Sequence, residues 1–244
     1  MTRLERLMAT LEGRPVDRPP VSFYEVGGWK MTPQPDNEFA VWNDPSWRPL
    51  ERLCEEESDI IRMMSPKWNI SGGSALDDMT KIEIWREGDC EFTRKTIEAP
   101  NRTLTSLTRR DVDTYTVWHL KHLLSDIDDI KAYLELPLQE VGDLDISELV
   151  EEEEALGDAG IVMVDTHDPI CEAAGLFSME DYTICALTEQ SLFQQLLERT
   201  AHYLFERCEK ICHAFPGHLW RVVGAEYAAE PYLPPYLYED YVVR

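Results

Sequence analysis

The stretch from Gly160 to Pro169 constrains the fold more than any other part of the sequence. It reads Gly160-Ile-Val-Met-Val-Asp-Thr-His-Asp-Pro169. Its four consecutive apolar residues, 161–164, predict a strand that is buried on both faces. Polar residues then end the strand, and Pro169 suits the first turn of a helix. This pattern is typical of an α/β protein, in which ligands bind at the carboxyl ends of parallel strands.

Three further segments predict strands of the same kind, at 21–24, 60–64 and 219–223. Helical spacing and capping residues predict helices at about 4–11, 45–57, 125–134, 146–156 and 189–215. A last apolar helix is expected to begin at Pro234-Pro235. Strands that alternate with helices through short connections indicate a parallel sheet. We therefore expect about four parallel strand–helix units in a single domain spanning residues 1–244.

The middle of the chain has a different pattern. Residues 80–86 and 90–97 alternate between apolar and polar, and Glu87-Gly-Asp89 lies between them as a turn, so a β-hairpin is predicted. Residues 102–108 also alternate and predict a third antiparallel strand. Because such a ribbon does not fit a parallel sheet, we expect residues 80–108 to form an inserted antiparallel β-hairpin flap.

The net charge of −24 on 244 residues excludes two classes of partner. Nucleic acids and anionic membrane surfaces both require a basic face, so neither is expected to bind. No run approaches the ~18 apolar residues that a membrane span needs, and the N-terminus lacks the pattern of a signal peptide. The six cysteines are scattered and suggest no disulfide framework, which favours a cytoplasmic protein with free thiols.

Two clusters on helices have both a functional and a structural interpretation. Cys208 and Cys212 lie four residues apart, a spacing that can hold a metal. They also belong to an apolar stripe, so we favour packing in the core. The acidic run from Glu151 to Glu154 could bind cations, but we interpret it as the solvated face of a helix.

Polar and aromatic residues gather where the predicted strands end. If the strands are parallel neighbours, these side chains converge on one edge of the sheet, where they could bind a polar ligand or hold a proton. The alternative for Asp168 is that it only caps the helix that begins at Pro169. The candidate residues are Glu25, Trp68, Asp165, His167, Asp168, Glu226 and Tyr227.

The chain resembles the uroporphyrinogen decarboxylase superfamily, which includes decarboxylases and corrinoid-dependent methyltransferases. One part of the resemblance is Arg6-Leu-Met-Ala-Thr-Leu-Glu-Gly-Arg-Pro-Val-Asp-Arg-Pro-Pro-Val21. The others are residues 118–134 and the segment Gly224-Ala-Glu-Tyr-Ala-Ala-Glu-Pro-Tyr-Leu-Pro-Pro-Tyr-Leu-Tyr-Glu-Asp-Tyr-Val242. The family fold is a (β/α)₈ TIM barrel. The resemblance therefore implies an incomplete barrel here, truncated at its C-terminal end.

Two departures from the decarboxylases point to the methyltransferase-like branch. Residues 24–30 lack the arginines that follow the first strand in decarboxylases, and Ser65 is followed by Pro66 instead of an aspartate. The resemblance then implies methyl transfer involving a corrinoid. From their positions at the strand ends, we expect Asp165 and His167 to be catalytic and the other five candidates to bind the substrate. The alternatives are a tetrapyrrole decarboxylase with a divergent site and a non-enzymatic porphyrinoid-binding fragment.

The resemblance also implies cofactors and partners. A full-length protein would use a corrinoid and zinc, but no metal ligand can be assigned to a residue of this chain, and no cofactor is expected within it. The expected partner is a small tetrapyrrole or corrinoid, in some cases carried by a corrinoid protein. Four strand–helix units would leave two open sheet edges, and the last helix would be uncovered, so we also expect self-association.

Overall fold

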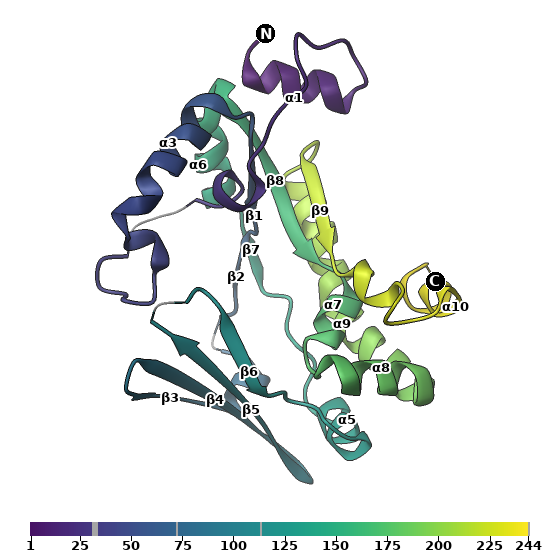
Figure 1. The fold of residues 1–244 in the computed structure, drawn as a ribbon. Coiled ribbons are helices and arrows are strands. Elements are labelled where there is room, and N and C mark those ends of the chain that lie inside the picture. The colour runs from purple at the N-terminus through teal and green to yellow at the C-terminus, as the bar shows by residue number, and fades with distance from the viewer. Residues whose placement is uncertain (31–33, 72, 113, 244) are drawn as a thin grey trace. The chain divides into compact units, whose positions relative to one another are not determined.

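The computed structural model describes residues 1–30, 34–71, 73–112 and 114–243 (Figure 1). The chain forms two compact units, each assembled from three segments. Unit 1 contains Met1–Lys67, Leu144–Thr166 and Ile211–Arg221. Unit 2 contains Trp68–Asp143, His167–Lys210 and Val222–Arg244. Strands β2 (Lys67–Asn69) and β7 (Asp143–Asp145) form a separate two-stranded pair.

A parallel sheet of three strands in the order β1-β8-β9 forms the centre of unit 1. Its strands are β1 (Ile60–Met64), β8 (Gly160–His167) and β9 (Leu219–Val223), so the predicted strands at 60–64, 161–164 and 219–223 are confirmed. The register pairs Ile60 with Gly160 and Met64 with Val164. A Cβ atom on Gly160 would lie 2.2 Å from the Ile60 carbonyl oxygen, which explains why glycine begins β8. Residues of β8 alternate between buried and half-buried, so the strand is less enclosed than its apolar run predicted.

Short helices and turns complete unit 1. They are α1 (Arg3–Leu11), α2 (Tyr24–Gly27), η1 (Val41–Asn43), η2 (Pro45–Trp47), α3 (Arg48–Glu57), α6 (Ser147–Leu156) and η3 (Gly157–Ala159). The Thr2 hydroxyl accepts a hydrogen bond from the Glu5 amide, and the Glu5 carboxylate accepts one from the Thr2 amide. This capping box fixes the start of α1.

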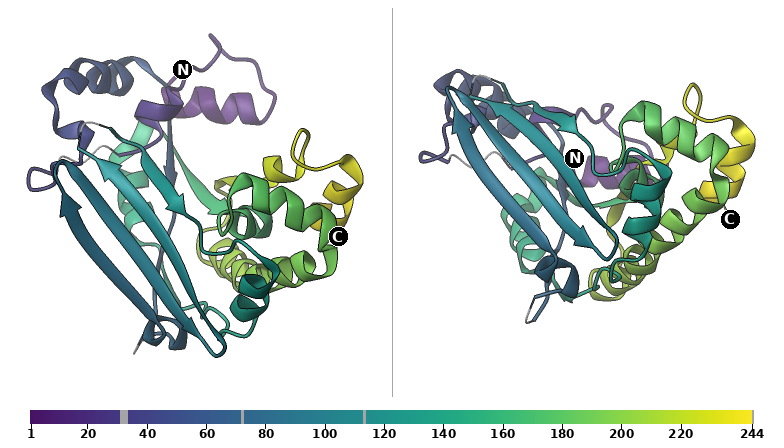
Figure 2. Two further views of the ribbon diagram at one scale, coloured as in Figure 1. Left: turned by 60° about the horizontal axis from the view of Figure 1, so that its bottom comes forward. Right: turned by 90° about the horizontal axis from the view of Figure 1, so that it is seen from below.

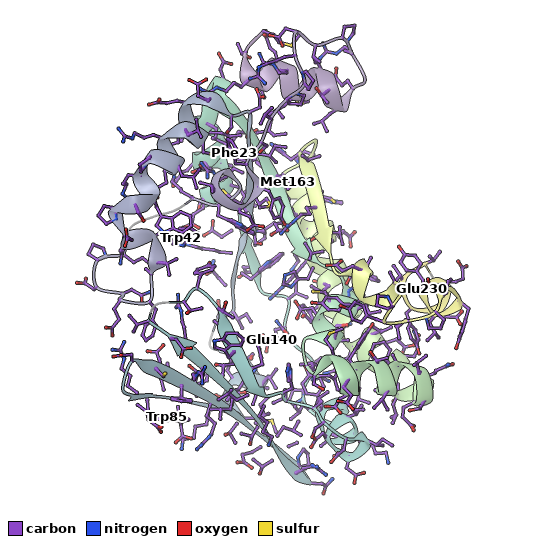
Figure 3. The ribbon with its side chains drawn as sticks, in the orientation of Figure 1. Phe23, Trp42, Trp85, Glu140, Met163 and Glu230 are labelled. Carbon is purple, nitrogen blue, oxygen red and sulfur yellow. The ribbon has the colours of Figure 1, made fainter. Side chains whose placement is uncertain are left out.

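The strand predicted at 21–24 is wrong. The Val21 amide donates to the Asp59 side chain (2.8 Å), and the Val21 carbonyl accepts from the Asp59 amide (2.7 Å). Both backbone groups of Val21 are thus satisfied by one residue, and the chain then turns into α2, just after Phe23 (Figure 3). The Gly28 carbonyl also accepts from the Met63 amide (2.7 Å), so this segment contacts β1 although it forms no strand beside it.

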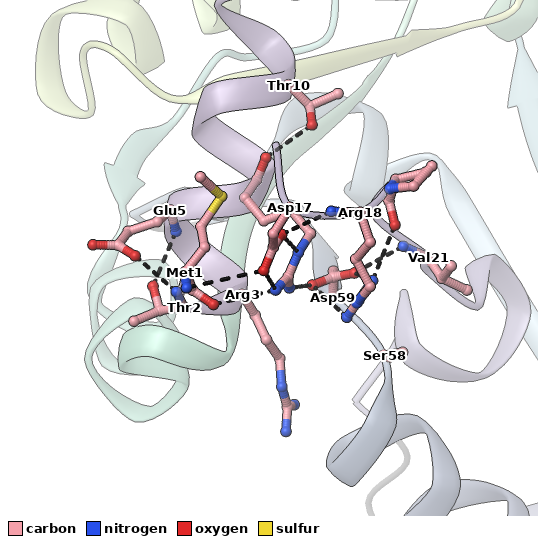
Figure 4. Close-up of polar contacts among 12 residues, drawn as sticks. Met1, Thr2, Arg3, Glu5, Thr10, Asp17, Arg18, Val21, Ser58 and Asp59 are labelled. Atoms are coloured by element: carbon pink, nitrogen blue, oxygen red, sulfur yellow. Dashed lines mark hydrogen bonds and ion pairs between the residues drawn. The ribbon is translucent and has the colours of Figure 1, made fainter. Parts of the chain in front are cut away.

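A buried cluster of charges ties α1 to the start of β1 (Figure 4). The Asp59 carboxylate is fully buried and accepts from Arg6 Nη1 (2.5 Å) and Arg18 Nη1 (2.7 Å), besides the Val21 amide. Arg6 also pairs with Asp17 through its Nε atom (2.7 Å). Arg6 and Arg18 therefore have a structural role, because they neutralise a carboxylate that is buried just before β1.

Unit 2 combines an antiparallel sheet with a cluster of helices. The sheet has the order β3-β4-β5-β6, with β3 (Thr80–Glu87), β4 (Cys90–Ala99), β5 (Arg102–Asp111) and β6 (Val117–Lys121) (Figure 2). Its pairings confirm the predicted hairpin and third strand, and they add a fourth strand. The helices are α4 (Ala75–Asp78), α5 (Ile127–Leu134), α7 (Pro169–Ala174), α8 (Met179–Thr188), α9 (Gln190–Ala214), η4 (Ala225–Ala228), α10 (Pro235–Tyr238) and η5 (Glu239–Val243).

One hydrophobic cluster holds unit 2 together. Ile97 and Leu104 from paired positions of β4 and β5 are buried in it with Tyr182 and Phe193 from the helices. The last helix is covered here too, contrary to expectation, since Leu237 is fully buried and the Tyr241 hydroxyl donates to the Ala186 carbonyl (2.8 Å). Leu237 and Tyr241 therefore have packing partners within this chain, whereas Tyr236 is 58% exposed.

The predicted TIM-barrel fold is contradicted. The structure has a parallel sheet of three strands and a separate antiparallel sheet of four strands, and this is not a barrel-like series of parallel strand–helix units. The missing parallel strand is the segment 21–24. The residues expected to form a flap belong to a four-stranded sheet whose Ile97 and Leu104 share a core with the helices of unit 2. Within the described ranges, no helix is both long and apolar enough to cross a membrane.

Candidate functional site

An ion pair between the end of β8 and the middle of β9 defines one candidate site in unit 1. Asp165 is 8% exposed, and its two carboxylate oxygens accept from Arg221 Nε and Nη2, each at 2.7 Å. The Asp165 carbonyl accepts from the Ser65 hydroxyl, which follows β1 (2.7 Å). Two parallel hydrogen bonds of this kind fix the orientation of a guanidinium as well as its position. Asp165 therefore fixes the orientation of the Arg221 guanidinium. A catalytic role for Asp165 stays a prediction.

Two aromatic rings lie close to this guanidinium. The Arg221 Cζ atom lies 5.4 Å from the ring centre of Tyr24 and 5.7 Å from that of Trp29, and Arg221 Nη1 donates to the Tyr24 hydroxyl. Such distances allow cation–π attraction. Tyr24 is 51% exposed and Trp29 is 38% exposed, so both rings offer surface to a ligand. We call these four residues, Tyr24, Trp29, Asp165 and Arg221, the Arg221 platform.

A second ion pair lies between β1 and α6 of unit 1. Arg62 Nε donates to the Glu152 carboxylate (3.0 Å), and Lys30 Nζ donates to its other oxygen (2.5 Å). Arg62 and Glu152 are 8% and 5% exposed. The interpretation of the 151–154 run as a solvated helix face is thus wrong for Glu152. Its neighbours in sequence are exposed, so only this residue of the run points inward.

In unit 2, Asp168 begins α7 and takes the capping role that was left open. Its carboxylate accepts from the Cys171 amide (2.8 Å). Gly224, at a φ of 137°, packs against it so closely that an added Cβ would lie 2.2 Å from Asp168 Oδ1. Burial raises the pKa of Asp168, and the nearby Glu226 carboxylate adds to the rise. Asp168 therefore keeps its proton to a higher pH than an exposed aspartate would.

The groups around Asp168 are also shifted toward their protonated forms. Burial, with Asp168 as the next cause, raises the pKa of the Cys171 thiol to about 12. Burial likewise raises the pKa of Tyr227, whose backbone carbonyl accepts from the Tyr182 hydroxyl (2.6 Å). The Glu226 carboxylate accepts from the Gly224 amide (3.1 Å). This part of unit 2 can hold protons, but its thiol is a poor nucleophile at neutral pH.

The remaining candidates have other neighbours. His167 Nδ1 lies 2.7 Å from the Glu172 carboxylate, and the His167 side chain is 54% exposed. Trp68 is half-buried on β2, and the Arg207 guanidinium lies 4.8 Å from its ring centre. Glu25 is exposed on α2. Their assignment to substrate binding or catalysis stays a prediction.

The structure brings together some of the predicted residues and not others. Asp168, Glu226 and Tyr227 form one group in unit 2, while Asp165 and Glu25 belong to unit 1. Sequence reasoning missed Arg221 and Arg62. A signal for both existed, since each is a charged residue inside an otherwise apolar strand, where charge needs a buried partner.

The cysteines of α9 were interpreted as core residues, and this is wrong for Cys212, which is exposed, while Cys208 is half-buried. Among the described residues, no group of three or more His, Cys, Asp or Glu side chains is placed to hold a metal ion. We therefore assign no chemical step to zinc.

Comparison with known proteins gives no relative for this chain. No family model, no curated protein and no solved structure matches it.

Proposed function

We propose that the protein binds a tetrapyrrole-class macrocycle, a corrinoid or a porphyrinoid, on the Arg221 platform of unit 1. The observation that carries the proposal is the Arg221 guanidinium, which lies within 5.7 Å of the ring centres of both exposed residues, Tyr24 and Trp29. A flat conjugated or corrin ring gains contact area on aromatic side chains. The carboxylate or carboxamide groups at the edge of such a macrocycle are acceptors that a guanidinium recognises.

The reaction that we propose for this complex is methyl transfer involving a corrinoid. The sequence resemblance supports this choice, and the Arg221 platform would bind and orient the macrocycle. Asp165 would keep the guanidinium aimed during binding, since it holds two of its nitrogen atoms. The corrinoid itself would carry the methyl group.

One observation favours decarboxylation as a second candidate. Loss of carbon dioxide from a substrate carboxylate leaves a carbanion that must take up a proton, so a decarboxylase needs an acid. Asp168 of unit 2 is an aspartate whose pKa is raised by burial, which suits it to that role. Stoichiometric release of carbon dioxide from uroporphyrinogen would place this candidate ahead of methyl transfer.

The binding proposal can be tested with hydroxocobalamin and uroporphyrin III. Each is titrated into the protein while tryptophan fluorescence and ligand absorbance are recorded. Replacing Trp29 by alanine removes one stacking partner worth roughly 0.5–1.5 kcal/mol, so we expect the Kd to rise by up to about tenfold. Arg221→Gln should weaken binding similarly and should lower its dependence on salt.

A matched control is Trp118→Ala, which removes an exposed tryptophan from β6 of unit 2. Its Kd should equal that of the unmodified protein. The proposal fails if neither macrocycle binds, or if Trp29→Ala and Arg221→Gln bind them as tightly as the control.

A further inference from the structure

Unit 1 contains a cavity of about 500 Å³ that the Arg221 platform does not explain. Its wall is formed by the end of α2 and the residues that follow it, by residues of α3 and α6, and by β1. The volume lies within the range of about 300–1,000 Å³ that is usual for small-molecule sites. Apolar side chains of Val26, Ile60 and Leu156 line part of it, so it can accept an apolar group as well as a polar one.

Arg62 brings a cation with spare hydrogen-bonding capacity to this cavity. Its Nε atom donates to Glu152, and its Nη1 atom donates to the carbonyls of Gly27 (2.9 Å) and Trp29 (2.6 Å). Among the described residues, Arg62 Nη2 has no hydrogen-bond partner. The Arg62 side chain is nevertheless only 10% exposed and its position is fixed by these three hydrogen bonds. An arginine held in this way is preorganised to receive a carboxylate.

Glu51 of α3 contributes an acceptor that lacks a donor. Its Oε2 atom pairs with Arg48, while its Oε1 atom is buried and, within the described part of the chain, accepts no hydrogen bond. Buried polar atoms in native proteins nearly always have a partner, so an unsatisfied carboxylate oxygen at a cavity calls for a bound donor. Glu55 lines the cavity one helical turn further along α3 and adds negative charge on the same side.

We propose that this cavity binds a small zwitterion, an amino acid with an apolar side chain. The ligand carboxylate pairs with Arg62 Nη2, and its ammonium group pairs with Glu51 Oε1. The apolar side chain packs against the wall formed by Ile60 and Leu156. This site differs from that of the proposed function and does not depend on it, although Trp29 lines the cavity and also belongs to the Arg221 platform.

The two ends of the proposed ligand can be tested separately with L-phenylalanine and its two halves. Phenethylamine keeps the ammonium group and lacks the carboxylate, whereas 3-phenylpropionate keeps the carboxylate and lacks the ammonium group. We expect calorimetry and thermal unfolding to show saturable binding of L-phenylalanine. Each half should have a Kd at least tenfold higher, because it leaves one charged partner in the cavity unpaired. No binding of L-phenylalanine, or equal binding of all three compounds, would overturn the proposal.

Substitutions in α3 and α6 place the binding in the cavity. Glu51→Gln removes the charge of the side chain and keeps its shape, so the ammonium group of L-phenylalanine no longer has a charged partner. L-phenylalanine and 3-phenylpropionate should therefore bind this variant with similar Kd values. The matched control is Glu57→Gln, an exposed glutamate of the same helix outside the cavity wall. Ala155→Trp puts a large side chain into the cavity from the exposed side of α6 and should abolish binding.

These variants also separate this proposal from the proposed function. Arg221→Gln should leave L-phenylalanine binding unchanged, and Glu51→Gln should leave macrocycle binding unchanged. If Glu51→Gln binds L-phenylalanine as tightly as Glu57→Gln does, the ammonium group is not held by Glu51 and the inference is wrong. If Ala155→Trp does not fold, judged by circular dichroism, the Glu51 comparison still decides.

Discussion

Asp59 is the residue whose replacement should destabilise unit 1 most clearly. Asp59→Asn keeps the size of the side chain and removes its charge. Its carboxylate is fully buried and accepts from Arg6, Arg18 and the Val21 amide. Removing one partner of a buried ion pair costs about 3–5 kcal/mol, because the other charge is left buried without compensation.

For Asp59→Asn we expect a loss at the lower end of the range of about 3–5 kcal/mol. The Arg18 side chain is 43% exposed and can turn to water, so losing its pair should cost at most about 1 kcal/mol. Arg6 is buried and keeps Asp17, but its Nη1 atom loses its acceptor, which costs about 1–3 kcal/mol. We therefore expect the free energy of unfolding to fall by about 3 kcal/mol.

Urea denaturation at neutral pH measures this change as a lower midpoint with an unchanged slope. Asp158→Asn is a suitable control, since Asp158 is exposed in the same unit. A loss below about 1 kcal/mol for Asp59→Asn would refute the reasoning, because that is the value of an exposed pair.

The contribution of Asp59 should also depend on pH. Burial alone would raise the pKa of Asp59, but the hydrogen bonds from Val21, Arg18 and Arg6 outweigh burial and lower it. A carboxylate with a lowered folded pKa stabilises the fold above its unfolded pKa, near 4, and this stabilisation is lost as the pH falls through the folded pKa. The difference in the free energy of unfolding between Asp59→Asn and the unmodified protein should thus have its full value at pH 7 and should decrease below about pH 4.

Three further predictions concern packing, thiol reactivity and metal content. Gly160→Ala should lower the free energy of unfolding by about 1–3 kcal/mol in urea denaturation, because its Cβ would meet the Ile60 carbonyl; no change would show that β1 and β8 can separate at no cost. Iodoacetamide at pH 8 should alkylate the exposed Cys212 well before Cys171, whose pKa of about 12 keeps it a thiol. Mass spectrometry of the labelled peptides measures the order of alkylation, and earlier labelling of Cys171 would contradict the prediction. Metal analysis after dialysis should find no stoichiometric zinc; one equivalent would contradict this, and Cys208→Ala and Cys212→Ala would then be examined first.

Local patterns predicted most of the elements but not their arrangement. The strands at 60–64, 161–164 and 219–223 and the hairpin at 80–97 are visible from apolar runs and alternation. The segment 21–24 has a strand-like composition, yet Asp59, almost forty residues away, satisfies the backbone of Val21. The four-stranded parallel sheet was expected from a count that included this segment, and the barrel was expected from the family resemblance. Neither contains information about which strands pair.

The candidate site was predictable where its residues follow strands. Asp165 and Asp168 could be selected from the abrupt end of one apolar run, although their roles as the partner of Arg221 and the cap of α7 depend on other segments. Glu152 lies in a run of four glutamates that looks uniformly solvated. Glu152 can be buried because its carboxylate pairs with Arg62, a residue that is ninety positions earlier in the sequence and comes close only in the folded unit. No local pattern contains this pairing.

The division of each unit into three segments bears on how the protein is made. Unit 1 needs residues up to Arg221 and unit 2 needs residues beyond Val222, so neither is complete until most of the 244 residues have left the ribosome. During synthesis β1 waits for about a hundred residues before β8, its partner, appears. At about 5–20 residues per second this interval lasts roughly 5–20 seconds. Nascent chains therefore carry an unpaired apolar strand for seconds, and a chaperone that shields such segments would have a defined interval in which to act.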